Sequence, residues 1–291
     1  MKLPTPDAES YDASLDYTRR FIEHWKDHPR IVPALGPHAA YTTTPEILAA
    51  VRQMADQYRV PILIHIAETV HEVDESLEEM GLSPVAWLDS IGLFEGGRVV
   101  AAHCVHADEG DLAILAERGV GVVSNPSSNL KLASGIAPYG EMLSREVRLG
   151  LGTDGCASNN DLNMIEEMRL AAFLAKVTSG DPTALPARQA LALGTIEGAR
   201  ALHMDDRIGS LEVGKQADIV ALDLQRPHNV PHYRVAEDNV YSQIVYAAGP
   251  DDVVHVLVAG RFLLRDGSFT TLDIAEVTAR AQAVADEVGR F

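Results

Sequence analysis

Six polar residues stand where short apolar stretches of this sequence end, and together they could hold a metal ion for hydrolysis. Five stretches predict strands that run into polar loops, namely residues 31–38, 61–68, 99–103, 121–125 and 148–154. The polar residues at or near their ends are His38, His65, Glu68, His103, Asn125 and Asp154. In a parallel α/β barrel the active-site groups lie at the C-terminal ends of strands, because all these ends open on one face. Two histidines, a glutamate and an aspartate on such a face would make a metal site.

His65 and Glu68 are the first candidate pair. A neutral imidazole at His65 can bind a metal, and a carboxylate three residues later can turn back over the same opening. Glu68 need not bind the metal, since it can take a proton from the attacking water and deliver it to a leaving nitrogen. The alternative is a buried histidine satisfied by the backbone, with Glu68 exposed at the start of a helix.

His103 and Asp154 complete the catalytic candidates. His103 ends an apolar strand, and it could either bind the metal or hydrogen-bond the attacking water and steer it. We favour it over His106, which falls later in the loop. Asp154 is followed by Gly155, and Gly152 lies just before it, so a ligand can approach the backbone closely. An ordinary Asp-Gly turn is the alternative interpretation of Asp154.

Substrate contact is the expected role of His38 and Asn125. His38 follows a rigid Gly-Pro turn and has no second titratable group nearby in the sequence, which favours binding over catalysis. Asn125 lies in a polar loop, residues 124–131, suited to hydrogen-bonding a polar ligand or to capping the next helix. Cys104 is expected to be a core thiol that faces away from His103.

The elements between these residues predict an α/β fold. Helices are expected between the strands, and repeated strand–helix units favour parallel pairing with right-handed crossovers. Only five such units can be counted, whereas a closed TIM-type (β/α)8 barrel needs eight. Later segments predict one helix at 187–203, a β hairpin at 209–222, two short strands at 253–264 and a helix at 272–289. We therefore expect an incomplete barrel over residues 1–206, a small β-subdomain at 207–268 and a C-terminal helix at 269–291.

Composition narrows the class of protein. The chain has 291 residues, 46% of them hydrophobic, and a formal net charge of -18. No basic stripe is available for nucleic acid or anionic membranes, and no window approaches the roughly 20 apolar residues that span a bilayer. The polar first ten residues argue against a secretory signal, and two cysteines suggest a reducing compartment. We expect a cytoplasmic protein that acts on a small molecule and could form a homo-oligomer.

Several motifs resemble the amidohydrolase superfamily, and most closely the 5-methylthioadenosine/S-adenosylhomocysteine deaminases and their triazine-hydrolase relatives. They are Gly-Pro-His (36–38), His-Ile-Ala-Glu-Thr (65–69), Ala-Ala-His-Cys-Val-His (101–106), Ser-Asn-Pro-Ser-Ser-Asn-Leu-Lys-Leu (124–132) and Gly-Thr-Asp-Gly-Cys-Ala-Ser-Asn-Asn (152–160). Residues 208–221 also resemble the C-terminal β-subdomain of that family. The likeness runs from about residue 1 to about residue 265.

The resemblance implies a role for each matched position. His65 would bind the metal from the fifth barrel strand, and Asp154 would be the ligand and proton acceptor from the eighth. Glu68 would carry protons to the ring nitrogen, and His103 would orient the attacking water. The residue that matches His38 contacts the ribose side of the substrate in adenosine-type deaminases.

The resemblance also implies a reaction and a cofactor. The reaction would be hydrolytic deamination of an adenine-type nucleoside with release of ammonia, at a divalent metal expected to be zinc, with iron and manganese as alternatives. The same residues would serve a relative that acts on a triazine, guanine or cytosine-like ring. An alternative outside the enzymes is a non-catalytic remnant that serves in binding or assembly.

One expected motif is absent. The family supplies two further metal ligands from a His-x-His motif at the end of its first strand, and this sequence contains no His-x-His. By the resemblance the chain begins just ahead of the fourth strand. We therefore expect a truncated chain that binds metal weakly and is inactive or nearly so by itself.

Overall fold

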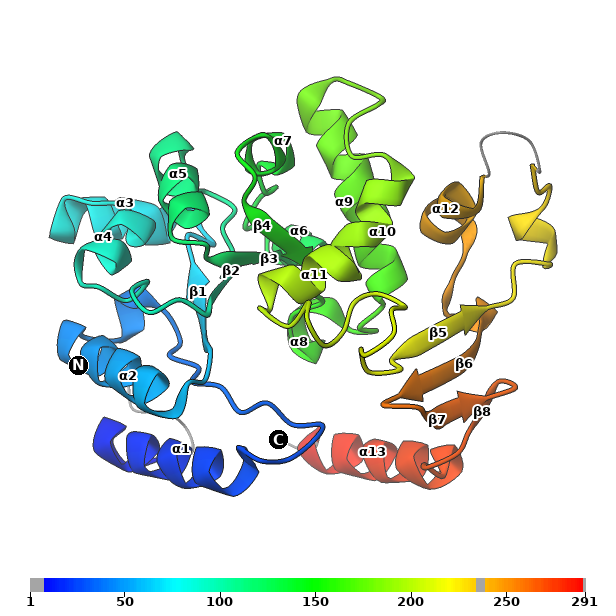
Figure 1. Cartoon of the computed structure of the whole chain (residues 1–291), viewed down its shortest axis with the longest axis horizontal. Helices are drawn as coiled ribbons and strands as arrows, with labels where there is room; N and C mark the ends of the chain where they lie inside the picture. The colour runs from blue at the N-terminus through cyan, green and yellow to red at the C-terminus, as the bar shows by residue number, and fades with distance from the viewer. Residues whose placement is uncertain (1–7, 234–238, 290–291) are drawn as a thin grey trace. The chain divides into compact units, whose positions relative to one another are not determined.

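The protein has two structural units, and each contains its own β-sheet. The computed structural model describes residues 8–233 and 239–289. The chain divides into two compact units, Met1–Ser210 and Leu211–Phe291. Among the described residues, the first unit has a four-stranded parallel sheet and the second a four-stranded antiparallel sheet (Figure 1).

The parallel sheet positions the candidate site. Its strands are β1 (Ile62–Ile66), β2 (Val99–His103), β3 (Gly121–Ser124) and β4 (Arg148–Leu151), and they lie side by side in sequence order. Parallel neighbours require crossover connections, which are usually helices. All four C-terminal ends therefore point to one edge of the sheet, as the sequence predicts for a parallel α/β protein.

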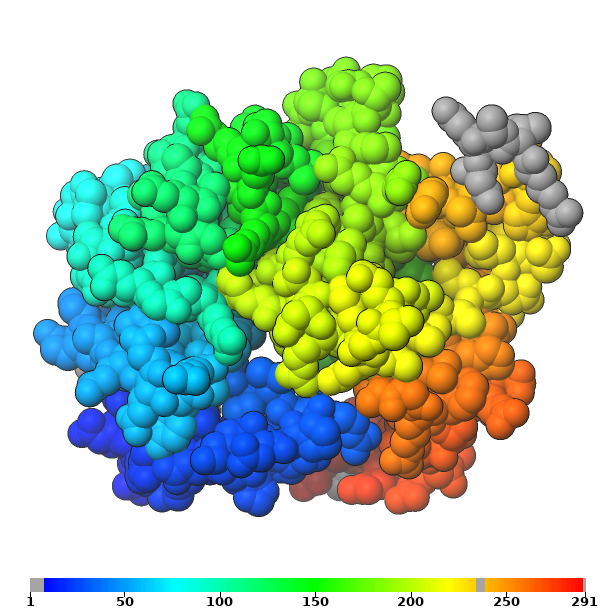
Figure 2. All heavy atoms as spheres, in the orientation of Figure 1, coloured from blue at the N-terminus to red at the C-terminus, as the bar shows by residue number. Residues whose placement is uncertain are grey.

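Helices surround this sheet. Before β1 come α1 (Tyr11–Trp25), the 3-10 turn η1 (Ala40–Thr42) and α2 (Pro45–Tyr58). The crossovers hold α3 (Val70–Met80), α4 (Pro84–Ser90), α5 (Glu109–Glu117), α6 (Pro126–Lys131) and α7 (Tyr139–Ser144). After β4 come α8 (Cys156–Asn159), α9 (Met164–Ser179), α10 (Ala187–Leu193) and α11 (Ile196–Ala201). Helices α3 to α5 form the outer surface at the left of the space-filling view (Figure 2). Leu88 of α4 and Leu112 of α5 are buried.

The segment expected as the first strand, residues 31–38, is not a regular strand. It forms only two isolated parallel bridges with β1, at Leu35 and Ala39. Pro33 and Pro37 have no backbone N–H, so they cannot donate to a ladder. The segment nevertheless runs beside β1, because the Leu35 N–H donates to the Pro61 carbonyl over 2.9 Å.

The helix expected at 187–203 is instead two helices, α10 and α11. The helix is interrupted at Gly194 and Thr195. Thr195 has φ -133° and ψ -101°, outside the helical region. Gly194 packs so closely on Met168 that a Cβ there would lie 2.7 Å from the sulfur. This close packing favours glycine at position 194, and Gly194 and Thr195 both have low helix propensity.

Two glycines of the sheet allow α11 to pack directly on β3 and β4. A Cβ at Gly121 would lie 1.8 Å from the carbonyl oxygen of Ala201, and one at Gly150 would lie 2.8 Å from the Cα of Gly198. Backbone therefore meets backbone at this contact, and only glycine fits at these strand positions.

The second unit is an antiparallel sheet of four described strands. They are β5 (Ile219–Leu222), β6 (Val253–Val258), β7 (Arg261–Arg265) and β8 (Ser268–Phe269). Its short helices are η2 (Pro227–Asn229), α12 (Val240–Ser242), the π-helix η3 (Gln243–Ala247) and η4 (Pro250–Asp252), and α13 (Ile274–Val288) follows β8.

One expectation for this unit needs correction. Of the hairpin expected at 209–222, the described residues form only β5, whereas the two strands expected at 253–264 are present as β6 and β7. The helix expected at 272–289 is present as α13, and none of its described residues is buried. Among the described helices of both units, none is long and apolar enough to cross a bilayer.

Candidate metal and catalytic site

The ends of three parallel strands share an unusual backbone conformation. Ala67 after β1, His103 and Cys104 at the end of β2, and Asp154 after β4 have φ of 50°, 73°, 49° and 61°. Left-handed backbone costs a non-glycine residue about 1–3 kcal/mol and tends to occur at functional sites. Strand alternation alone would place His65 and His103 on opposite faces of the sheet, because His103 pairs with Ile66. The turn at His103 explains how the two rings can nevertheless meet.

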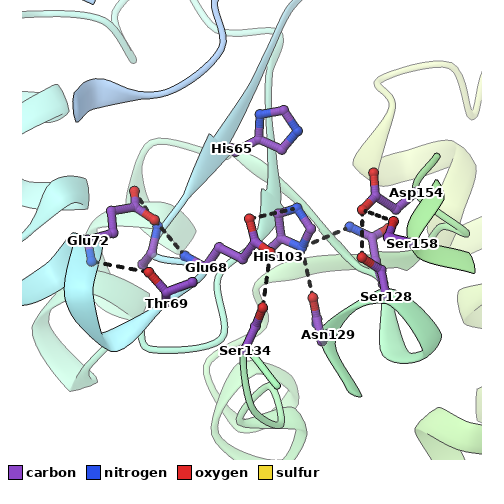
Figure 3. Close-up of polar contacts among 12 residues, drawn as sticks. His65, Glu68, Thr69, Glu72, His103, Ser128, Asn129, Ser134, Asp154 and Ser158 are labelled. Atoms are coloured by element: carbon purple, nitrogen blue, oxygen red, sulfur yellow. Dashed lines mark hydrogen bonds and ion pairs between the residues drawn. The ribbon is translucent and has the colours of Figure 1, made fainter. Parts of the chain in front are cut away.

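His65, His103 and Asp154 form a cluster that could hold a metal ion. Their ligand atoms all lie within 4.8 Å of one another. The two imidazole rings are stacked, with centroids 5.4 Å apart (Figure 3). Two imidazole nitrogens and a carboxylate oxygen are a donor set that divalent transition metals accept. The residues present therefore fit a divalent metal.

His65 is oriented by the backbone of residue 38. Its Nδ1–H donates to the His38 carbonyl oxygen over 2.6 Å, which leaves Nε2 as the ligand atom. The His38 ring lies beside it, with centroids 5.0 Å apart, and its Nδ1 contacts the Thr42 hydroxyl at 3.0 Å. Burial, followed by the nearby His65, lowers the pKa of His38. A neutral His38 at the rim can therefore contact a polar substrate.

Glu68 reaches across from the turn after β1 toward His103. Its Oε2 lies 3.6 Å from His103 Nε2, and only 20% of its side chain is exposed. The Ser134 hydroxyl donates to the other oxygen, Oε1, over 3.0 Å. Glu68 therefore has one oxygen held and the other beside an imidazole, an arrangement that suits a group that moves protons.

Glu72 fixes the turn that carries Glu68. Its carboxylate accepts the backbone N–H of Ala67 over 3.0 Å and that of Glu68 over 2.8 Å. Glu72 is only 4% exposed, and burial raises its pKa against the effect of these two hydrogen bonds. The left-handed turn at Ala67 is thus stabilised from inside α3.

Asp154 is held by two hydroxyl groups. Ser128 and Ser158 donate to its Oδ2 over 2.6 and 2.8 Å. Burial acts to raise the pKa of Asp154, but the hydrogen bonds from these two serines outweigh it and the pKa lies below its ordinary value. The carboxylate is therefore kept ionised, which is the form that binds a metal.

His103 is the buried member of the cluster. It is 1% exposed, and Asn125 and Asn129 beside it are 3% and 1% exposed. Its Nδ1 lies 2.8 Å from Asn129 Oδ1 and 3.4 Å from Asn125 Nδ2. Cys104 is fully buried as a free thiol, and burial raises its pKa, as expected of a core cysteine.

The structure brings all six predicted residues into one neighbourhood but adds supporting residues that sequence reasoning missed. Glu72 could have been found, because Thr69 and Glu72 have the spacing of a capping box. Ser134 could not, since 66 residues separate it from Glu68. Ser158 gave no signal of its own beside Asp154, and Asn125 makes no side-chain hydrogen bond that caps α6.

Known proteins are similar in sequence to nearly the whole of this chain. A 5-methylthioadenosine/S-adenosylhomocysteine deaminase from Syntrophobacter fumaroxidans is 46% identical over 282 residues, which are 97% of this chain and 63% of that protein. A 5'-deoxyadenosine deaminase from Methanothermobacter thermautotrophicus is 45% identical and covers 97% of this chain and 65% of its own length. The chain thus spans a little under two thirds of the curated relatives it matches.

Solved structures of similar proteins have the same fold as this chain. An adenosine deaminase from Xanthomonas campestris with bound zinc superposes with a TM-score of 0.94 at 42% identity, over 99% of this chain and 64% of that one. An atrazine chlorohydrolase from Arthrobacter aurescens, complexed with zinc, has a TM-score of 0.83 at 27% identity, over 94% and 60%. The model of the amidohydrolase family matches residues 2–263. The chain belongs to the amidohydrolase family.

Proposed function

We propose that this site carries out metal-dependent hydrolytic deamination of an adenine-type nucleoside, of the 5-methylthioadenosine or S-adenosylhomocysteine class. The observation that carries the proposal is the meeting of His65, His103 and Asp154 with a carboxylate, Glu68, beside them. The names of the relatives from Syntrophobacter and Methanothermobacter supply the substrate class.

The proposed metal ligands are His65 and Asp154, and His103 is the third member of the cluster. Zinc is the expected metal, because the structures from Xanthomonas and Arthrobacter contain zinc, and iron or manganese suit the same donors. When bound, a divalent metal acts as a Lewis acid that makes water acidic enough to attack at neutral pH.

The chain's own residues would manage protons and orientation. We assign to Glu68 and Asp154 the acceptance of protons from the attacking water, to Glu68 their delivery to the ring nitrogen, and to His103 the orientation of that water. His38 and Asn125, with Glu68 and Asp154, are the proposed substrate contacts. Water adds to the carbon that bears the amino group, the carbon–nitrogen bond breaks, and ammonia leaves with the transferred protons.

A wider assignment follows from the same family. We propose a TIM-type barrel architecture in which residues 1–206 supply strands four to eight, with a β-subdomain at 207–268 and a C-terminal helix at 269–291. The parallel order of β1 to β4 supports it. A cytoplasmic enzyme with a small-molecule substrate, and without nucleic-acid or membrane partners, is consistent with a net charge of -18. The proposed architecture is also compatible with a homo-oligomer.

Triazine, guanine or cytosine-like rings are the alternative substrates. The Arthrobacter atrazine chlorohydrolase and an Escherichia coli guanine deaminase, with TM-scores of 0.83 and 0.81, are the observations that favour them. The same candidate residues would serve these reactions, so a panel of substrates has to separate them.

The test is zinc-dependent ammonia release by the purified chain from 5-methylthioadenosine, S-adenosylhomocysteine and guanine, with chloride release measured for atrazine. We expect release from the first two that Glu68→Gln lowers about 100- to 10,000-fold, the usual contribution of an acid–base group. Glu78→Gln, on the exposed side of α3, is the matched control and should leave the rate unchanged.

The same assay tests the expectation that this chain alone is nearly inactive. A slow release that still disappears in Glu68→Gln would support both the chemistry and that expectation. Release at ordinary enzyme rates would contradict the expectation of near inactivity, and a slow release that Glu68→Gln leaves unchanged would contradict the proposed function.

A further inference from the structure

Two buried asparagines face the same ring nitrogen of His103 and make opposite demands on it. Asn129 places its side-chain oxygen 2.8 Å from His103 Nδ1, and Asn125 places its amide nitrogen 3.4 Å from the same atom. An amide oxygen only accepts, so Asn129 requires a protonated Nδ1, whereas an amide nitrogen only donates, so Asn125 requires an unprotonated one. A neutral imidazole carries one proton, and only one of the two demands can be met.

The distances decide between them. A separation of 2.8 Å is normal for an N–H···O hydrogen bond, while 3.4 Å is beyond the usual range. Because Asn129 and His103 are each 1% exposed, little water is available to replace their hydrogen bond.

We propose that Asn129 is a positioning residue that holds His103 as its Nδ1–H tautomer, so that the lone pair of Nε2 faces the site. Nε2 then lies 3.6 Å from the Glu68 carboxylate and within the cluster of His65 and Asp154. An unprotonated Nε2 and the Glu68 carboxylate can share a proton or a cation that lies between the two groups. The inference rests on the proposed function, in which water oriented by His103 can donate to Nε2 only if that nitrogen carries no proton.

His65 shows the same arrangement with a different acceptor. Its Nδ1–H donates to the His38 carbonyl oxygen, so its Nε2 is also unprotonated when the ring is neutral. A carbonyl oxygen behind each ring therefore directs two lone pairs toward Asp154. A neutral His65 can then bind a metal through Nε2 without first losing a proton, and a neutral His103 can accept a hydrogen bond from water at Nε2.

Two other histidines have the opposite arrangement and serve as internal controls. His106 donates from Nε2 to the Ser134 carbonyl oxygen over 2.6 Å. His203 donates from Nε2 to the Val99 carbonyl oxygen over 3.1 Å. Both rings should therefore be Nε2–H tautomers. One spectrum of the chain should contain both kinds of histidine.

The experiment is nitrogen NMR of the whole chain labelled with ¹⁵N-histidine, after a chelator has removed any metal. A pH of about 8.5, two units above the ordinary histidine pKa of about 6.5, keeps the rings neutral. Protonated and unprotonated ring nitrogens have clearly different shifts, and single His→Asn variants identify the signals of His103, His106 and His203. We expect Nδ1–H for His103 and Nε2–H for the other two.

Variants at position 129 separate positioning from general packing. Asn129→Leu keeps a similar volume but removes the acceptor, so His103 should change to the Nε2–H tautomer. The signals of His106 and His203 should not move, whereas a general loss of structure would move them too. Asn129→Asp keeps an acceptor oxygen and should preserve the Nδ1–H tautomer even if the leucine variant fails to fold.

A wild-type spectrum with His103 as the Nε2–H tautomer would overturn the proposal. So would an Asn129→Leu chain in which His103 remains Nδ1–H. The result does not depend on ammonia release: an inactive chain can still show the tautomer, and an active chain can fail to show it. Failure of this inference and failure of the proposed function are therefore distinguishable.

Discussion

The two sheets of this chain both contain left-handed residues next to strand ends, but these residues do different work. In the antiparallel sheet, Ala259 and Gly260 (φ 48° and 75°) join β6 to β7, and Asp266 and Gly267 (49° and 73°) join β7 to β8. Two consecutive left-handed residues are the usual tight turn of a hairpin. There the conformation reverses the chain, and the neighbouring side chains stay exposed.

In the parallel sheet the same conformation at His103 turns a side chain inward. His103 has φ 73° and is 1% exposed, and no chain reversal follows it. Parallel strands bring all their C-terminal ends to one edge, while antiparallel strands alternate their ends between two edges. Left-handed backbone therefore indicates a site only where it coincides with converging strand ends and buried polar groups.

The largest expected effect is a loss of zinc affinity, and it should distinguish a histidine of the parallel sheet from one of the antiparallel sheet. His65→Gln removes a proposed ligand from the parallel sheet, so the apparent zinc Kd should rise by more than the 10- to 100-fold that loss of a supporting partner costs. His255→Gln, in β6, should leave it unchanged. Isothermal titration of both variants with zinc gives the comparison, and equal affinities would remove the metal assignment from the parallel sheet.

Glycine replacements should show a smaller difference. In Gly121→Ala the new Cβ would lie 1.8 Å from a backbone oxygen of α11, so we expect destabilisation of about 3 kcal/mol or more. In Gly260→Ala no atom lies within 4 Å and only the φ of 75° is unfavourable, which costs about 1 kcal/mol. Urea unfolding measures both. A Gly121→Ala chain as stable as the wild type would show that α11 does not pack on β3 as described.

The smallest effect concerns the pH dependence contributed by Glu72. Burial raises its pKa in the folded state, so its contribution to stability is present below the unfolded value of about 4.3 and declines as the pH rises through the folded value. Glu72→Gln cannot titrate. The destabilisation it causes should therefore be larger at pH 4 than at pH 7. Unfolding free energies of both chains across this range test the sign, and a penalty that grows with pH would contradict it.

The sequence was enough to single out candidate residues that the structure brings together, but not the local backbone that arranges them. His65, Glu68, His103 and Asp154 could be identified because polar residues after apolar stretches converge in any parallel sheet. The direction of the His103 ring could not, since it depends on a left-handed turn that strand alternation does not predict.

Tertiary contacts explain most of the remaining differences. Residues 31–38 have a strand-like pattern, but two prolines leave only isolated bridges. Gly194, at the break between α10 and α11, packs closely against Met168. The hydrogen bond from Ser134 to Glu68 joins residues that are far apart in the sequence. The prolines act locally, whereas the other two contacts involve neighbours that are distant along the chain.

The contact between His65 and residue 38 has a consequence for how this site can change. His65 is held by the backbone carbonyl of residue 38, through both its ring and its own N–H. Every amino acid provides that carbonyl, whatever its side chain. The side chain at position 38 can therefore be exchanged while His65 keeps its orientation, so the proposed substrate contact and the proposed metal ligand can vary independently of each other.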